Sequence, residues 1–439
     1  MHVIFGLDPV VTAAVILLVA YGLVISDRFD RSIIALLGAG AMILAGVLTQ
    51  EEAIRGVDFN TIALLSGMMI LVSVARRSGV FEFLAIWSAQ RVNASPAGVL
   101  CLLSLVTAIV SALLDNVTTV LLLAPVTLAL AQRLRVAPFP FLVGVVMASN
   151  IGGAATLIGD PPNIMIGSAA GLSFNAFVLN LTPAILVVMA CQLVATHLIW
   201  GRSTPATREA REAVMTLAAA SAITDRRLLR LSLGVFAVTL LAFVFAAKLR
   251  LEPGSIALIA AAALMLLDNL AHRRALHAEK MVAIYADVDW ITIFFFVGLF
   301  VMVRGFEMTG ALASLAHDLV AATHGNLAIT ASAILWGAAI LSAVIDNIPF
   351  VAAMIPLIKM LAPQFGGDAA ILPLWWALAL GACVGGNGTL LGASGNLAVA
   401  GIAQRAGLRF DFLAYLKYAA PLTITSLAIC QLYLWLRYF

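Results

Sequence analysis

The chain has 439 residues, of which 63% are hydrophobic and 11% are charged, and its formal net charge is +3. A water-soluble protein of this composition could not cover its surface with polar groups, so the composition excludes soluble enzymes and binding domains. The basic residues lie between apolar runs and form no tail, which does not suit a nucleic-acid partner. We therefore expect an all-α polytopic membrane protein that has the lipid bilayer as its main partner.

The first half consists of apolar runs separated by charged turns. Runs long enough to span a membrane are predicted at residues 9–26, 32–49 and 59–74. The shorter stretch 81–91 contains charge, so we expect it to lie along the membrane interface. Runs 98–114 and 117–131 meet at Asp115-Asn116 and have basic residues at their outer ends, which predicts a re-entrant hairpin with this pair at its tip. Residues 139–170 form a span broken by glycines and a Pro pair, and 177–200 closes the half.

The second half repeats this order after a polar linker at residues 201–230. Its predicted elements are spans at 231–247, 255–267 and 290–303, an interfacial segment at 310–319, a hairpin of 326–345 and 348–361, a broken span at 374–404 and a closing span at 413–436. The second hairpin has Asp346-Asn347 at its tip. The chain is thus expected to divide into a first repeat at 1–200, a linker at 201–230 and a second repeat at 231–439.

The two halves also share residues at a constant separation of 231 positions. This separation joins Asp58 to Asp289, Thr61 to Thr292, Gly67 to Gly298, Gly79 to Gly310, Asp115 to Asp346, Asn116 to Asn347 and Pro125 to Pro356. Ungapped agreement over such a length indicates a duplicated unit. If each hairpin enters and leaves on one side, each half crosses the membrane an odd number of times, so the two repeats must have inverted topology.

The basic residues divide unevenly between the two sides of this topology. One side holds 19 of the 25, and the other holds only Arg55, Lys248, Arg250, Arg304, Lys359 and Arg437. Cytoplasmic loops carry an excess of Lys and Arg, so the rich side is assigned to the cytoplasm. The linker 201–230 is then cytoplasmic, both termini lie outside, and the membrane is the cytoplasmic (inner) membrane.

The two hairpin tips are the strongest candidates for chemistry. An isolated carboxylate inside hydrocarbon costs at least ~2.5 kcal/mol, so such groups are kept for function more often than for stability. Asp115 and Asp346 can hold a proton or bind a hard cation, and Asn116 and Asn347 add amide acceptors and donors. Na⁺ is therefore a candidate coupling ion at these four residues, and no other cofactor is expected.

Further candidates lie in the two broken spans, because discontinuous helices of inverted-repeat transporters present their termini to substrates and ions. The candidate binding residues are Asp115, Asn116, Thr118, Asn150, Gly152, Gly153, Gly159, Asp160, Asn163, Asp346, Asn347, Gly385, Gly386, Asn387, Gly392, Ser394 and Asn396. Structural alternatives stand beside these roles. Asp160, followed by Pro161, could simply cap a half-helix. The asparagines of the breaks could only satisfy freed backbone groups.

Other polar residues carry less information. Cys101, Cys191, Cys383 and Cys430 stand singly in apolar runs, with neither metal-ligand nor disulfide spacing, so we interpret them as core residues. Asp58 and Asp289 lie near the ends of predicted spans, and we expect them to remain outside the site.

Two stretches carry a family resemblance. SALLDNVTTVLLLAPVTLAL, followed by ASNIGGAATLIGDPPNIMIG, resembles the ion transporter superfamily, in particular its arsenite permease and P-permease branch. More distantly, the layout is similar to the divalent anion/sodium symporters, whose tips carry Ser-Asn-Thr and whose broken span carries Gly-Thr-Pro-Pro-Asn. Here these positions read Asp115-Asn116-Val117, Asp346-Asn347-Ile348 and Gly159-Asp160-Pro161-Pro162-Asn163, while the second break keeps only Gly392 and Asn396.

This resemblance implies a secondary active transporter for an inorganic ion or small oxyanion, with arsenite or antimonite efflux as the first substrate to consider. Coupling to H⁺ or Na⁺ by alternating access is expected, and enzymatic activity is not. A Na⁺/H⁺ antiporter and a cation-coupled carboxylate transporter are alternatives.

Two other classes of membrane protein use similar features. An ion channel also uses broken helices. An intramembrane aspartyl protease needs two buried aspartates, but the Gly-x-Gly-Asp motif that it expects is missing. A nucleotide-binding loop is missing too, so ATP drive would need a separate ATPase subunit. A homodimer is a further candidate assembly.

Overall fold

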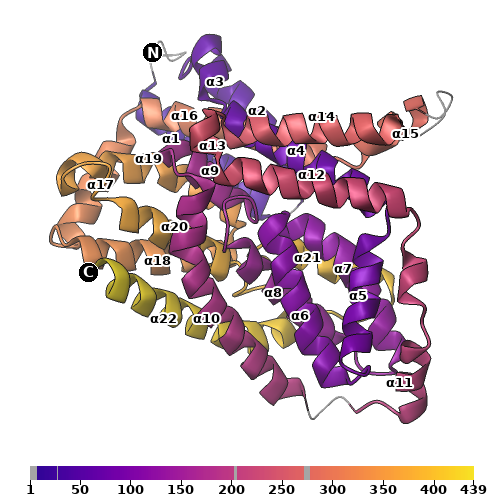
Figure 1. Ribbon diagram of the computed structural model, residues 1–439. Coiled ribbons are helices and arrows are strands. Elements are labelled where there is room, and N and C mark those ends of the chain that lie inside the picture. The colour runs from indigo at the N-terminus through magenta and orange to yellow at the C-terminus, as the bar shows by residue number, and fades with distance from the viewer. Residues whose placement is uncertain (1–6, 27, 202–204, 271–276) are drawn as a thin grey trace.

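The structure is a computed structural model, and it describes residues 7–26, 28–201, 205–270 and 277–439. All regular structure in these ranges is helical (Figure 1). The first half contains α1 (Pro9–Ile25), α2 (Arg31–Leu44), α3 (Gln50–Gly56), α4 (Phe59–Arg76), α5 (Val80–Arg91), α6 (Pro96–Leu113), α7 (Asn116–Arg133), α8 (Phe139–Gly153), α9 (Pro161–Ala170) and α10 (Phe174–Trp200).

The second half follows two short helices of the polar linker, α11 (Arg208–Met215) and the 3₁₀ helix η2 (Ala219–Ala222). It contains α12 (Arg226–Val244), α13 (Ala246–Leu249), α14 (Pro253–Asn269), α15 (His277–Ala286), α16 (Trp290–Met308), α17 (Ala311–Ala322), α18 (Leu327–Val344), α19 (Asn347–Phe365), α20 (Leu372–Gly385), α21 (Ser394–Arg405) and α22 (Phe412–Tyr438).

Nine helices of the described ranges are long and apolar enough to cross a membrane. They are α4, α6, α7, α10, α12, α16, α18, α19 and α22. The predicted span 32–49 is shorter than expected, because α2 has 14 residues and ends at Leu44. At 1.5 Å per residue, α2 is about 21 Å long, less than the hydrocarbon core of a typical bilayer.

The interruptions of the apolar runs lie where the sequence predicts them. Leu114 and Asp115 separate α6 from α7. Ile345 and Asp346 separate α18 from α19 in the same way. The two broken spans are α8–α9, interrupted over residues 154–160, and α20–α21, interrupted over 386–393. The all-helical membrane fold is confirmed, whereas the inverted orientation of the repeats and the re-entrant path of the hairpins stay predictions.

The two halves interleave instead of forming separate bodies. α2 of the first half packs on α16 of the second, and α14 packs on α4 (Figure 1). Glycines make both crossings close: a Cβ at Gly298 would lie 2.6 Å from the oxygen of Ala35, and one at Gly67 would lie 2.6 Å from the backbone carbon of Ala257. Residues from both halves therefore meet in the centre, where the broken spans lie.

The polar linker is docked and partly helical. The Arg211 side chain donates to the carbonyl of Asn93, at 2.8 Å from Nη2, and the Thr224 backbone N–H donates to the carbonyl of Ser78 at 3.0 Å. α12 begins at Arg226, so the regular structure of the second half starts inside the predicted linker. Residues 202–204 of the linker lie outside the described residues, and so do three of the 19 basic residues assigned to the cytoplasmic side, Arg202, Arg273 and Arg274.

Candidate functional site

Each broken span is held open by an asparagine near the start of its second helix. Asn163 Nδ2 donates to the carbonyl of Thr156 at 2.9 Å, and Asn396 Nδ2 donates to the carbonyls of Gly386 at 2.8 Å and Thr389 at 2.9 Å. Both asparagines are buried. Because helix breaks leave carbonyls without partners, this is the structural role that the sequence left open for Asn163 and Asn396.

The glycines of the breaks face neighbouring backbone. The six predicted ones are Gly152, Gly153, Gly159, Gly385, Gly386 and Gly392. A Cβ at Gly152 would overlap the backbone of Ala108 in α6, and a Cβ at Gly159 would lie 2.6 Å from the oxygen of Gly153. Gly385 and Gly392 meet equivalent neighbours in the second half. These residues therefore shape the breaks and bring them against the hairpins; they do not line the cavities described below.

Four buried asparagines form a network that joins the two halves. Asn116 Nδ2 donates to Asn150 Oδ1 at 3.1 Å, and Asn150 Nδ2 donates to Asn387 Oδ1 at 2.9 Å and to Asn396 Oδ1 at 3.0 Å. Each of the four is no more than 3% exposed. Asn150 is the centre of this network, so it links the first hairpin tip to the second break.

The first hairpin tip is a capped helix terminus with a spare acceptor. Asp115 Oδ1 accepts the backbone N–H of Thr118 at 2.8 Å and so caps α7. Thr118 itself is half-buried. Asn116 Oδ1 is buried and accepts no hydrogen bond from the described residues. A buried amide oxygen without a donor is costly, which makes it a ready position for a cation or a donor group.

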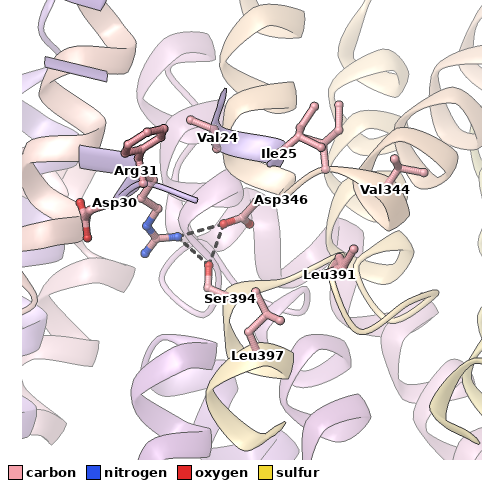
Figure 2. Close-up of a pocket in the computed structure, with 11 residues that line it drawn as sticks. Val24, Ile25, Asp30, Arg31, Val344, Asp346, Leu391, Ser394 and Leu397 are labelled. Carbon is pink, nitrogen blue, oxygen red and sulfur yellow. Dashed lines mark hydrogen bonds and ion pairs between the residues drawn. The ribbon is translucent and has the colours of Figure 1, made fainter. Parts of the chain in front are cut away.

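The second hairpin tip, which Figure 2 shows, is built differently from the first. Asp346 makes no capping hydrogen bond. Instead its Oδ2 accepts from Arg31 Nη1 at 3.0 Å and from Ser394 Oγ at 2.7 Å, and Arg31 Nη1 also donates to Ser394 Oγ at 2.8 Å. Arg31 Nη2 donates to Thr292 Oγ1 at 2.7 Å, and the guanidinium lies 5.3 Å from the ring centre of Phe295. At an effective dielectric constant of about 20, such a pair attracts by about 4 kcal/mol.

Asp160 occupies the position before α9 without capping it. Its side chain makes no capping hydrogen bond, and its oxygens lie 3.4 and 3.5 Å from Asn347 Nδ2 of the second tip. The residue is fully buried. The interpretation of Asp160 as only a cap therefore does not describe its side chain, which is directed toward the second tip.

A small cavity lies between the two tips. It has a volume of about 20 Å³, enough for one water molecule or one ion, and Asp115, Asp160, Asp289 and Arg31 are among its lining residues. Asp289, which we expected to remain outside the site, is thus one of the lining residues of this cavity. Because α16 packs on α2, the N-terminus of α16 is brought to the centre with its capping aspartate.

A larger cavity opens beside the second tip. It has a volume of about 280 Å³ and is lined by residues of α1, the turn before α2, the second hairpin tip and the second break (Figure 2). Arg31, Asp346 and Ser394 lie together on its wall. Asp30 points away from this group.

Arg31 is the central residue that the sequence did not single out. In the sequence it is only one of the 19 basic residues on the side assigned to the cytoplasm. A signal was present, because a cation in the first turn of a helix opposes the helix dipole and so needs an acidic partner elsewhere. Asp30 caps α2 through the backbone of Ser32, and the partner of Arg31 is Asp346, which is 315 positions away in the sequence.

The site does not resemble a transition-metal centre. Within the described ranges, no group of three or more His, Cys, Asp or Glu side chains is arranged to hold a metal ion. The four cysteines are free thiols and lie apart. A hard monovalent cation bound by carboxylate, amide and carbonyl oxygens fits the donor set at Asp115 and Asn116 better.

The chain is similar to several transporters over nearly its whole length. It is 43% identical to an uncharacterized transporter of Mycobacterium tuberculosis over 98% of this chain and 99% of that one. It is 39% identical to the 46 kDa membrane protein of Mycobacterium leprae over 98% of this chain and 99% of that one. The P protein of Sus scrofa is 31% identical over 97% of this chain, which spans 59% of that longer protein.

A solved structure and a family match agree with this. The crystal structure of the YdaH transporter of Alcanivorax borkumensis has a TM-score of 0.58 with 13% identity and covers 98% of both chains, which supports the fold. Residues 21–381 match the family described as citrate transporter. This chain is therefore a multi-pass membrane transporter that belongs to the citrate transporter family of the ion transporter superfamily.

Proposed function

We propose that this protein is a secondary active transporter that couples the movement of H⁺ or Na⁺ to that of a small solute by alternating access across the cytoplasmic membrane. The observation that supports this is the charge of its buried centre: three aspartates and a single basic side chain, Arg31, line one small cavity. Excess negative charge away from water is stabilised when a proton or a cation shares the site. The centre therefore binds a cation during each cycle.

Arsenite or antimonite is the first substrate that we propose. At neutral pH these are small, uncharged hydroxides that a negatively charged centre does not repel, and the buried amides of Asn116, Asn150 and Asn387 offer hydrogen-bond partners for them. Transport in this case is efflux driven by the cation gradient.

A cation-coupled carboxylate is the second candidate. The family match to citrate transporters favours it, and so does Arg31, whose planar guanidinium suits a carboxylate and lies on the wall of the larger cavity. Free citrate carries several negative charges, so this substrate requires a cation to enter with it past Asp346 and Asp160. A Na⁺/H⁺ antiporter, in which the cations are the only cargo, is the remaining alternative.

Flux into proteoliposomes tests the proposal. The purified full chain is reconstituted, and uptake of labelled arsenite, citrate and ²²Na⁺ is measured with imposed pH or Na⁺ gradients. We expect saturable accumulation of one solute that collapses when an ionophore dissipates the driving gradient. Liposomes without protein and the Asp115→Asn variant are the controls.

Two other outcomes of the flux measurement would indicate a different function. Flux that neither saturates nor responds to any cation gradient would contradict the transporter cycle and indicate a channel. Accumulation of ²²Na⁺ that is driven by an imposed pH gradient, with no flux of the other solutes, would show that the protein is a Na⁺/H⁺ antiporter.

A further inference from the structure

Arg31 connects the first half to the second through four partners. It is the first residue of α2, but Asp346, Ser394, Thr292 and Phe295 all belong to the second half. The Arg31 side chain is 22% exposed and that of Asp346 is 16% exposed, so the pair is largely removed from water. A buried charge with this many directed contacts is held in one geometry.

The equivalent position in the other half has no such side chain. α2 packs on α16 and α14 packs on α4, so α2 and α14 hold matching places. Gly298 of α16 meets Ala35, four residues after Arg31, and Gly67 of α4 meets Ala257, four residues after Pro253. Pro253 therefore stands in α14 where Arg31 stands in α2. Proline carries no charge, so the second half offers no counterpart of Arg31, and among the described residues only the second tip has an ion-paired carboxylate.

The charge at the two tips differs accordingly. At the first tip, Asp115 forms no ion pair among those found in the described ranges, and Asn116 Oδ1 is buried without a donor. At the second tip, Arg31 pairs with Asp346 Oδ2, while Asp346 Oδ1 is buried and accepts no hydrogen bond from the described residues. The other charged groups near this pair are Asp115, Asp160 and Asp289, which line the small cavity together with Arg31. A guanidinium remains protonated at any physiological pH and is attached to the chain, so it cannot leave with the substrate.

We propose that Arg31 is a fixed internal cation that fills the cation position of the second hairpin tip, so that only the first tip takes a mobile coupling cation. This inference rests on the cation coupling proposed above. It reduces the mobile cations per cycle from the two that a symmetric duplication would bind to one. It also makes Arg31 the residue that sets the charge moved in each turnover.

Counting bound cations tests the inference without knowledge of the substrate. ²²Na⁺ bound per chain is measured by equilibrium dialysis on the purified full-length protein at pH 8.5. Arg31→Gln removes the fixed cation, and we expect this variant to bind one more Na⁺ per chain than the wild type. Arg31→Lys keeps the charge, and the double variant Arg31→Gln/Asp346→Asn removes both charges, so both should bind as many as the wild type. Arg28→Gln, which removes an exposed cation of the same turn, is the matched control.

An unchanged Na⁺ count in Arg31→Gln, or an additional Na⁺ in Arg31→Lys, would overturn the inference. Should Arg31→Gln fail to fold, Asp346→Asn decides in its place: its count must equal that of the wild type, and a lower count contradicts a second tip already filled by Arg31. Failure of the proposed function is separate, because it is judged by gradient-driven flux of the wild type and not by the number of bound ions.

Discussion

The two hairpin tips carry the same Asp-Asn pair and yet have different surroundings. Asp115 caps its helix and lies beside an amide oxygen without a partner, whereas Asp346 leaves its helix uncapped and forms an ion pair with Arg31. The duplication thus places a carboxylate at equivalent positions of the two halves. Residues outside the duplicated Asp-Asn motif, such as Arg31, make the charge around the two carboxylates different.

The two breaks show the opposite behaviour, because their backbone contacts match closely. Ser111 Oγ donates to the carbonyl of Ser149, and Ser342 Oγ donates to that of Ala382, in both cases at 2.7 Å. The side chains at the break differ more. In the breaks equivalent residues are 233 positions apart, so Asp160 has Ala393 as its counterpart in the second half. The scaffold of the halves is therefore kept symmetric while the charged groups at its centre are not.

The largest expected effect is at the first hairpin tip, where we propose that the mobile cation binds. Asp115→Asn keeps a capping side chain but removes the carboxylate, so it should abolish gradient-driven accumulation. One charge moved across 100 mV is worth ~2.3 kcal/mol, which corresponds to about 50-fold accumulation that the variant loses. Labelled solute retained in proteoliposomes at steady state measures this.

Asp58→Asn is the matched control for that change. Asp58 caps α4 through the backbone of Asn60 and Thr61, at 3.0 and 3.2 Å, and Asn caps equally well. We expect its accumulation to stay within about two-fold of the wild type. Full accumulation by Asp115→Asn would show that the first carboxylate is only a cap.

The second prediction compares the symmetric breaks. Gly385→Val places atoms into the backbone of Ala339 and should lower the yield of folded protein strongly, because overpacking of a closed contact costs at least about 1–3 kcal/mol. Gly152→Val, against Ala108, should do the same. Gly337→Ala, in the middle of α18 with open space around it, should be tolerated. Fluorescence-detected gel filtration of detergent extracts gives the yields, and a normal yield from either Val variant would contradict the close packing.

Much of this arrangement could be predicted from the sequence, since apolar run length, the Asp-Asn interruptions and the glycine-rich breaks are local signals. The helix ends at Leu113 and Val344 lie beside the Asp-Asn interruptions, and both breaks fall within the glycine-rich stretches, although α8 continues to Gly153 instead of ending before Ala148. The separation of 231 positions added the pairing of the two tips. In the breaks the separation is 233 positions, which pairs Asn163 with Asn396, and these two residues make matching contacts.

The contacts between the halves could not be predicted in this way. Arg31 meets Asp346, and Asp289 reaches the small cavity, only because α2 packs on α16, and no local pattern encodes which helix of one half lies against which helix of the other. The network through Asn150 has the same origin, because it joins side chains 237 and 246 positions apart.

The third prediction concerns the inverted orientation of the halves, which depends on the charge distribution. In a variant without native cysteines, a cysteine at Thr216 of the linker should be protected from impermeant thiol reagents in intact cells, and one at Leu249 should react. Both positions are exposed in the structure, so a difference in labelling reports the side of the membrane. Permeabilised cells, in which both should react, are the control, and reversed labelling would overturn the orientation.

The smallest expected effect is that of Cys383→Ser. Cys383 stands in the second half at the position that matches Asn150, 233 residues earlier. Asn150 centres the asparagine network, so Asn150→Ala should reduce transport strongly. Cys383 Sγ lies 3.5 Å from Asn163 Oδ1, and a serine hydroxyl can replace the thiol as donor. We therefore expect Cys383→Ser, alone or with the other three cysteines replaced, to transport within about two-fold of the wild type in the proteoliposome assay. The panel of solutes makes the comparison sharper: if arsenite flux alone vanishes in Cys383→Ser while other activity persists, the thiol binds arsenic directly, and the second half contributes a ligand where the first contributes an amide.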